Sequence, residues 1–185
     1  MAEAKHMRTL LHDERGGAHI LVFTLLAIGF SVLLFVVSIQ WMLQSANKTK
    51  SKLALDRAVH AASLHVDPYE AASGRLVWDE VAGEADFYRY LRLNFQLDEA
   101  GQPQAGSHLP ASPMVHTLEF VTSATYPAVI ERVVDVMSDG ALIASRHVEV
   151  TVYGPSVVAI VEVRQQGLGR TEPILLSSVA SIRFR

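Results

Sequence analysis

The stretch DERGGAHILVFTLLAIGFSVLLFVVSIQWML, residues 13–43, decides the fold of this chain. Its first three residues are charged, two glycines follow, and the remainder contains no Asp, Glu, Lys or Arg. From Ile20 to Leu43 there are 24 residues, of which 16 are Leu, Ile, Val or Phe. As an α-helix this run would measure about 36 Å, enough to cross a hydrocarbon core of about 30 Å with some tilt. The sequence therefore predicts a membrane-spanning helix.

Two other interpretations of the apolar run stay open at this point. A buried helix of a soluble protein is one, although such helices are usually shorter and keep a polar face. A cleaved secretory signal is the other. Its apolar core would be about 7–15 residues and would end at a small-x-small site. After this longer run, however, QSANKTK offers only Ser45 and Ala46. Within the run, Ala27 and Ser31 form a small-xxx-small pair that would let a neighbouring helix approach.

Composition and charge exclude several classes of function. The 185 residues include no cysteine, which excludes a disulfide framework, a thiolate metal site and a cysteine nucleophile. The formal net charge is -3, so nothing indicates a phosphate-binding surface for nucleic acid, and we expect no nucleic-acid partner.

No local pattern indicates catalysis, a cofactor or a metal site. The eight histidines are scattered along the chain: His6, His12, His19, His60, His65, His108, His116 and His147. No two of them have the three- or four-residue spacing that places zinc ligands on one helical face. The serines lack the context of a nucleophile elbow. We therefore expect no catalytic residue, no cofactor and no metal, and hence a protein that is not an enzyme.

The junction at the start of the apolar run resembles that of the TadE/TadG-like pseudopilins of tight-adherence (type IVc) pili. In that family a short polar leader ends in glycine, a prepilin peptidase on the cytoplasmic face cuts after it, and the apolar helix stays as anchor and assembly element. Here a cut between Gly17 and Ala18 puts Phe23 at the sixth position, where the family has phenylalanine. A cut after Gly16 would shift Phe23 by one place. Many members carry glutamate before that phenylalanine, whereas this chain has Val22, as TadG-like members often have an apolar residue.

The resemblance continues after the apolar run, so that it covers residues 13–66. LALDRAVHAASLHVD looks like the alanine-rich LQNAxDAAALAA stretch that follows the anchor in the family. The resemblance implies a minor pilin or pseudopilin-like, membrane-anchored subunit of a tight-adherence-type pilus or related secretion assembly. Its partners would be the membrane, prepilin peptidase and other pilin-like subunits.

The orientation in the membrane follows from the resemblance and not from charge. The family implies a cytoplasmic N-terminus and an extracytoplasmic C-terminal domain in a single-pass protein of the cell membrane or pilus. Basic residues stand on both flanks of the apolar run, three before it and four after: Lys5, Arg8, Arg15, Lys48, Lys50, Lys52 and Arg57. Their count leans slightly toward the opposite orientation. An uncleaved single-pass extracytoplasmic binding or scaffold module is the alternative function.

Two further helices are predicted beyond the apolar run. Leu55, Val59, Ala62 and Val66 are spaced four, three and four residues apart, which predicts an amphipathic stem helix that ends at Asp67-Pro68. After Asp79, which can cap a helix, apolar residues again keep helical spacing. They are Val81, Ala85, Tyr88, Leu91 and Phe95. Three prolines and two glycines then mark residues 98–113 as a loop.

Short runs rich in β-branched residues follow from Met114 and predict five strands. SDG, with Asp139 and Gly140, predicts a hairpin between the second and third, and Tyr126-Pro127 puts the start of the second at a sheet edge. The short spacing predicts an antiparallel meander with one face on the stem helix.

These predictions combine into an α+β, pilin-like fold. An N-terminal transmembrane helix continues into a stem helix, which packs on an antiparallel β-sheet. The predicted organisation is a leader (1–17), a transmembrane helix (18–43), a stem helix (44–66), a helix and loop region (67–113) and an antiparallel sheet (114–185).

Overall fold

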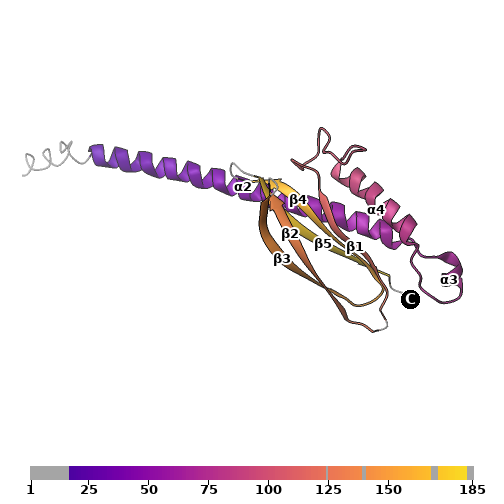
Figure 1. Ribbon diagram of the computed structural model, residues 1–185. Helices are drawn as coiled ribbons and strands as arrows, with labels where there is room; N and C mark the ends of the chain where they lie inside the picture. The colour runs from indigo at the N-terminus through magenta and orange to yellow at the C-terminus, as the bar shows by residue number, and fades with distance from the viewer. Residues whose placement is uncertain (1–16, 124, 139–140, 168–170, 183–185) are drawn as a thin grey trace, which may run out of the picture. The chain divides into compact units, whose positions relative to one another are not determined.

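The computed structural model describes residues 17–123, 125–138, 141–167 and 171–182 (Figure 1). They belong to two compact units that divide between Leu43 and Gln44. The described part of the first unit is helical throughout. The second unit, residues 44–185, is called the C-terminal domain below and contains helices and antiparallel strands. The α+β fold class predicted from the sequence is therefore confirmed.

Helix α2 (Gly17–Ser63) contains 47 residues and includes the whole apolar run. Nearly every side chain described between residues 17 and 43 is exposed. The hydroxyls of Thr24 and Ser38 donate hydrogen bonds to the backbone oxygens four residues earlier, at 2.7 and 2.8 Å. Hydroxyls that are bonded within the helix in this way are suited to lipid, where no water can satisfy them.

The last part of α2 builds the core of the C-terminal domain. Leu55, Val59 and Ala62 are fully buried, which confirms the apolar stripe predicted for the stem. The helix ends at Ser63, a few residues before the predicted stop. Asp67 instead caps the short helix α3 (Pro68–Ala72), because its carboxylate accepts the first backbone N–H groups there.

Helix α4 (Glu80–Phe95) begins at Asp79 as predicted, with the Asp79 carboxylate accepting the N–H of Ala82 at 3.1 Å. Only two of the five apolar residues at helical spacing are buried. Leu91 and Phe95 are buried, whereas Val81 is 82% exposed. Ala85 and Tyr88 are exposed as well.

Gly83 explains why α4 presents a different face. Gly83 and Phe87 take the contact with the core. A Cβ on Gly83 would lie 2.8 Å from ring carbons of Phe120 and 3.1 Å from the backbone oxygen of Ala62. Only a residue without a side chain allows α4 to pack this closely against α2, so the face with Gly83 turns inward.

Five strands follow the loop: β1 (Met114–Val121), β2 (Ala128–Ser138), β3 (Ala141–Val152), β4 (Ser156–Gln166) and β5 (Thr171–Ser181). All pair antiparallel, as predicted, but the predicted single meander is wrong. The strands form two sheets, one with the order β1-β4-β5 and one of β2-β3. Strand β2 pairs with β3 from Ala128 opposite Val152 to Ser138 opposite Ala141, as a hairpin requires. Asp139 and Gly140 lie outside the described residues.

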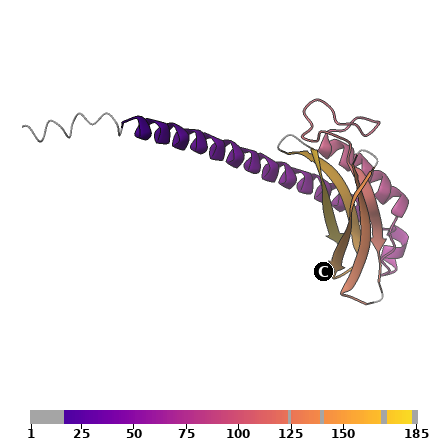
Figure 2. The ribbon, with the colours of Figure 1, turned by 60° about the vertical axis from the view of Figure 1, so that its left-hand side comes forward.

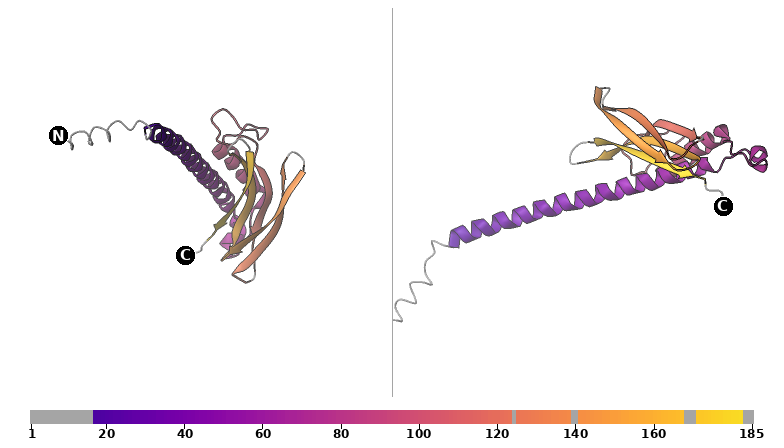
Figure 3. Two further views of the ribbon diagram at one scale, coloured as in Figure 1. Left: turned by 90° about the vertical axis from the view of Figure 1, so that its left-hand side faces the viewer. Right: turned by 90° about the horizontal axis from the view of Figure 1, so that it is seen from below.

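The composition of β4 explains this topology. Residues 156–163 of this strand are all buried, so both faces and both edges of its apolar run must be covered. Val157 and Val161 face a core shared with α2 and α4, whereas Val158 faces a second core shared with Ile130 and Val150 of the β2-β3 ribbon. Within the C-terminal domain, the β1-β4-β5 sheet therefore lies between the helices and the ribbon (Figures 2 and 3). The predicted packing of the stem on an antiparallel sheet is confirmed.

Candidate membrane segment and polar clusters of the C-terminal domain

The described residues contain one helix that is long and apolar enough to cross a membrane, within His19–Ser63 of α2. None of the residues in the most apolar 18-residue stretch of this helix is buried. The core helix of a soluble protein would be mostly buried, so this finding disfavours the first of the alternative interpretations. Length and composition are thus compatible with single-pass membrane anchoring.

The residues of the predicted processing motif stand at the start of the described part of α2. Gly17 and Ala18 are its first two residues. Val22 and Phe23 are one turn further and are 58% and 76% exposed. Gly16 lies outside the described residues. Gly17, Val22 and Phe23 therefore lie in a helical segment and are exposed, and cleavage between Gly17 and Ala18 stays a prediction.

Ala27 and Ser31, the predicted helix-packing pair, are both exposed and lie one helical turn apart. At about 100° per residue, Thr24 and Ser38 fall on the same side of the helix, within about 60° of each other and of this pair. The hydroxyls of Thr24 and Ser38 are bonded within the helix, whereas among the described residues the Ser31 hydroxyl has no partner. One face of the apolar run therefore carries small residues and an unpaired donor.

A second polar feature of the run is Gln40, whose side-chain oxygen has no hydrogen-bond partner among the described residues. By helical spacing this residue lies on the opposite side from Ser31. An unpaired amide in lipid gains from a hydrogen bond to a neighbouring helix. Of these two groups without a partner among the described residues, Ser31 is exposed and the Gln40 oxygen is covered.

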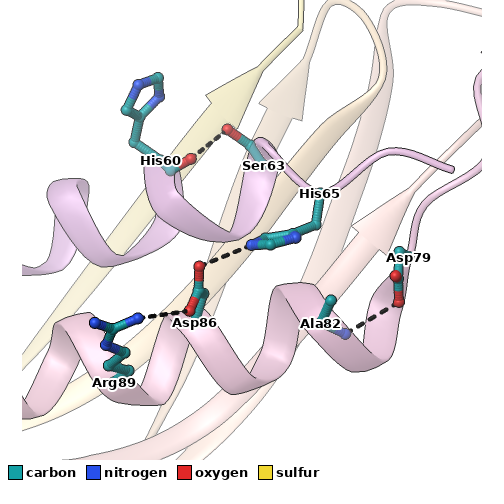
Figure 4. A network of polar contacts seen from close by, with 7 residues as sticks. All are labelled: His60, Ser63, His65, Asp79, Ala82, Asp86 and Arg89. Carbon is teal, nitrogen blue, oxygen red and sulfur yellow. Dashed lines mark hydrogen bonds and ion pairs between the residues drawn. The ribbon is translucent and has the colours of Figure 1, made fainter. Parts of the chain in front are cut away.

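In the C-terminal domain, His65 and Asp86 join the end of α2 to α4 (Figure 4). His65 Nε2 lies 2.8 Å from Asp86 Oδ2, and Arg89 Nη1 lies 3.8 Å from Asp86 Oδ1. His60 is exposed, and its ring points away from this cluster in Figure 4. The two histidines of the stem therefore do not converge on a common ligand.

A buried hydrogen-bonded pair lies within the β1-β4-β5 sheet. His116 stands in the β1 bulge, and its Nε2 lies 3.1 Å from Glu162 Oε2 of β4. Glu162 is buried, so His116 supplies the hydrogen bond that a buried carboxylate needs. No group of three or more His, Cys, Asp or Glu that could hold a metal ion occurs in the part of the chain that the structure describes.

A third cluster fixes α2 to β5. Lys52 Nζ pairs with Asp56 one turn along α2 and donates to the backbone oxygen of Ser177 at 2.7 Å. The Ser178 hydroxyl donates to Asp56 at 2.6 Å. These bonds cross from the stem to the sheet and fix their relative position, in addition to the apolar core.

Ser51 and His108 form a pair that the sequence did not predict, because 57 residues separate them. Ser51 Oγ lies 2.8 Å from His108 Nε2, and the His108 ring stacks on Phe95 with centroids 5.9 Å apart. Burial, and then the positive charge of Lys50, lower the pKa of His108. A serine beside a neutral histidine can act as a nucleophile only if substrate can reach it. Ser51 is fully buried, so the pair instead attaches the 98–113 loop to α2.

No family model, no curated protein and no solved structure matches this chain. Inference about function therefore rests on the residues of α2 and of the C-terminal domain.

Proposed function

We propose that this chain is a minor pilin or pseudopilin-like, membrane-anchored subunit of a tight-adherence-type pilus or related secretion assembly. The observation that carries the proposal is the composition of α2 along its length. One helix includes a glycine junction, a run of 24 uncharged residues, and an alanine-rich stem that is part of the core of an α+β domain. A subunit of this plan acts by position and contact, without a catalytic residue.

In this proposal prepilin peptidase cuts between Gly17 and Ala18 on the cytoplasmic side. The apolar run stays in the membrane, and the C-terminal domain lies outside the cytoplasm. Exposure of Val22 and Phe23 supports access to the junction. The membrane, the peptidase and other pilin-like subunits are the partners.

The polar groups of the apolar run support an assembly role. Ala27 lets a neighbouring helix approach closely, and the unpaired hydroxyl of Ser31 can then donate across the contact. Such contacts connect α2 to the apolar helices of other subunits. Val22 stands where many family members have glutamate, so this chain would contact neighbours without that charge.

Mass spectrometry of the full chain, co-expressed with an active prepilin peptidase and extracted from membranes, tests the proposal. The expected mature chain begins at Ala18. Gly17→Leu should block the cut, whereas Gly16→Leu, the matched control one residue earlier, should still be cut after Gly17. An intact N-terminus, under conditions where the same peptidase cuts a known prepilin, would contradict the proposal.

An uncleaved, single-pass extracytoplasmic binding or scaffold module is the second candidate. Val22 favours it, because the residue that many processed and assembled members use is absent. The same experiment separates the two, since an anchor of this kind keeps its N-terminus.

A further inference from the structure

A pocket of about 320 Å³ opens on the C-terminal domain where α2, the end of α4 and the 98–113 loop meet. Its charged and titratable side chains are Lys50, Arg57 and His108. Asn94 and Gln96 add amide groups to the lining. No Asp or Glu is among its described lining residues. The pocket is therefore polar, and any charge it carries is positive.

The two strong bases of this pocket have no counter-charge among the residues that the structure describes. Among the described residues, neither Lys50 nor Arg57 takes part in an ion pair or a hydrogen bond, and both are exposed. Lys52, between them on the same helix, is bonded to Asp56 and to the sheet. Of Lys50, Lys52 and Arg57, only Lys52 is paired among the described residues, and the two unpaired bases line one pocket.

The third basic group, His108, is held in place from two sides. Ser51 bonds its Nε2, and Phe95 stacks on its ring. Its Nδ1 has no partner among the described residues. Burial, and then the positive charge of Lys50, lower the pKa of His108. An anion bound beside Lys50 would offset that charge and raise the pKa of His108.

We propose that this pocket binds a phosphate group, either free or in the headgroup of an anionic phospholipid. Arg57 and Lys50 supply charge-assisted hydrogen bonds, for which phosphate oxygens are strong acceptors. Lys50 stands only seven residues after Leu43, the last residue of the apolar run, so that a membrane surface is one natural source of the phosphate. The site does not depend on processing or on filament assembly.

The test uses the full chain in a zwitterionic detergent and follows the His108 ring by NMR. One arm titrates inorganic phosphate, and the other titrates dihexanoyl phosphatidylglycerol, with dihexanoyl phosphatidylcholine, a zwitterion of zero net charge, as the comparison. We expect saturable shifts and a rise in the pKa of His108 with at least one anionic probe. A response to inorganic phosphate identifies a free-anion site, and a response to the phosphatidylglycerol alone identifies a lipid site.

Matched variants decide whether the pocket itself is responsible. Lys50→Gln and Arg57→Gln should each weaken binding about fivefold, since one base near a membrane surface contributes about that factor. Lys48→Gln removes the same charge from the same helix but outside the pocket, and should change the affinity less than twofold. The proposal is overturned if neither probe gives a saturable shift, or if Lys48→Gln weakens binding as much as Lys50→Gln.

Discussion

The two parts of α2 have the same backbone conformation and opposite relations to their surroundings. In residues 17–43 the large apolar side chains point outward all around the helix, and Leu33, for example, is 58% exposed. In residues 44–63 alanines and a few larger apolar residues face a packed core, and Leu55 is fully buried. Arg57 and His60 of this second part remain exposed, whereas Ser51 and Ser63 are buried.

The difference shows that the distribution of side chains around a helix, and not its tendency to be helical, sets its environment. A helix that is apolar on every side requires lipid or many neighbours, because a single protein core covers only one face. The thin stripe of the second part needs only one sheet and one helix to bury it. Each of the four predictions below changes one part of α2 or a residue that contacts its second part.

The largest expected effect comes from truncating a leucine in the second part. Leu55→Ala removes a fully buried side chain and should lower the free energy of unfolding of the C-terminal domain by about 2–5 kcal/mol. Leu33→Ala, the same change at an exposed position, should leave it within about 0.5 kcal/mol. Denaturant unfolding of the full chain in detergent measures both. Equal losses for the two variants would contradict the division of α2 described above.

A charge in the first part should act on membrane insertion instead. Leu33→Arg should cost about 2.5–3.5 kcal/mol of insertion, against a gross gain of about 5–10 kcal/mol for the whole run. The single variant should therefore remain in the membrane, and Leu33→Arg combined with Val36→Arg should be extracted by alkaline carbonate. Leu53→Arg, at an exposed position of the second part, serves as the control and should not alter extraction. Extraction of the parent chain itself would exclude a membrane helix.

How far sequence could predict this molecule depends on whether a feature is local. The stripe of Leu55 and Val59 repeats within a few residues, and Asp79 caps the helix that follows it at once, so both were predictable. The inward face of α4 was not, because Gly83 counts against a helix locally and gains its value only from contact with Ala62 and Phe120.

The other features that the sequence could not predict depend on pairing between distant segments. Strand β1 pairs with β4, and not with β2, because the apolar run of β4 is buried and needs a neighbour on each face and along each edge. No turn signal between neighbours encodes that choice. The pocket of Lys50 and His108 likewise depends on where the 98–113 loop folds back, which its prolines and glycines permit but do not specify.

A methyl group on Gly83 should have a smaller effect. Gly83→Ala overpacks the contact with Phe120 and Ala62, a type of change that lowers the unfolding free energy by about 1–3 kcal/mol. The higher helix propensity of alanine offsets up to about 1 kcal/mol of this loss. We expect a net loss of about 1 kcal/mol in the unfolding free energy of the C-terminal domain. Gly29→Ala is the matched change in the first part of α2, where nothing lies within 4 Å of the new methyl group, and should leave that free energy unchanged. A stabilised Gly83→Ala would show that α4 can move away without loss.

The smallest effect concerns pH and arises at His108, which contacts Ser51 in the second part of α2. Burial and the charge of Lys50 lower the pKa of His108 in the folded chain below its ordinary value of 6.5. The unfolded chain therefore binds a proton at this residue more readily than the folded chain does. This contribution to stability is fully present above pH 6.5 and is lost as the pH falls from there toward the folded pKa.

His108→Gln should flatten that portion of the stability profile between pH 7.5 and pH 5, measured by denaturant unfolding against the parent chain. Lys50→Gln should flatten it partly, because it removes the lesser of the two causes and leaves burial in place. A parent profile with the same slope as that of His108→Gln would mean that this imidazole keeps its ordinary pKa in the folded chain, and that Lys50 does not act on it.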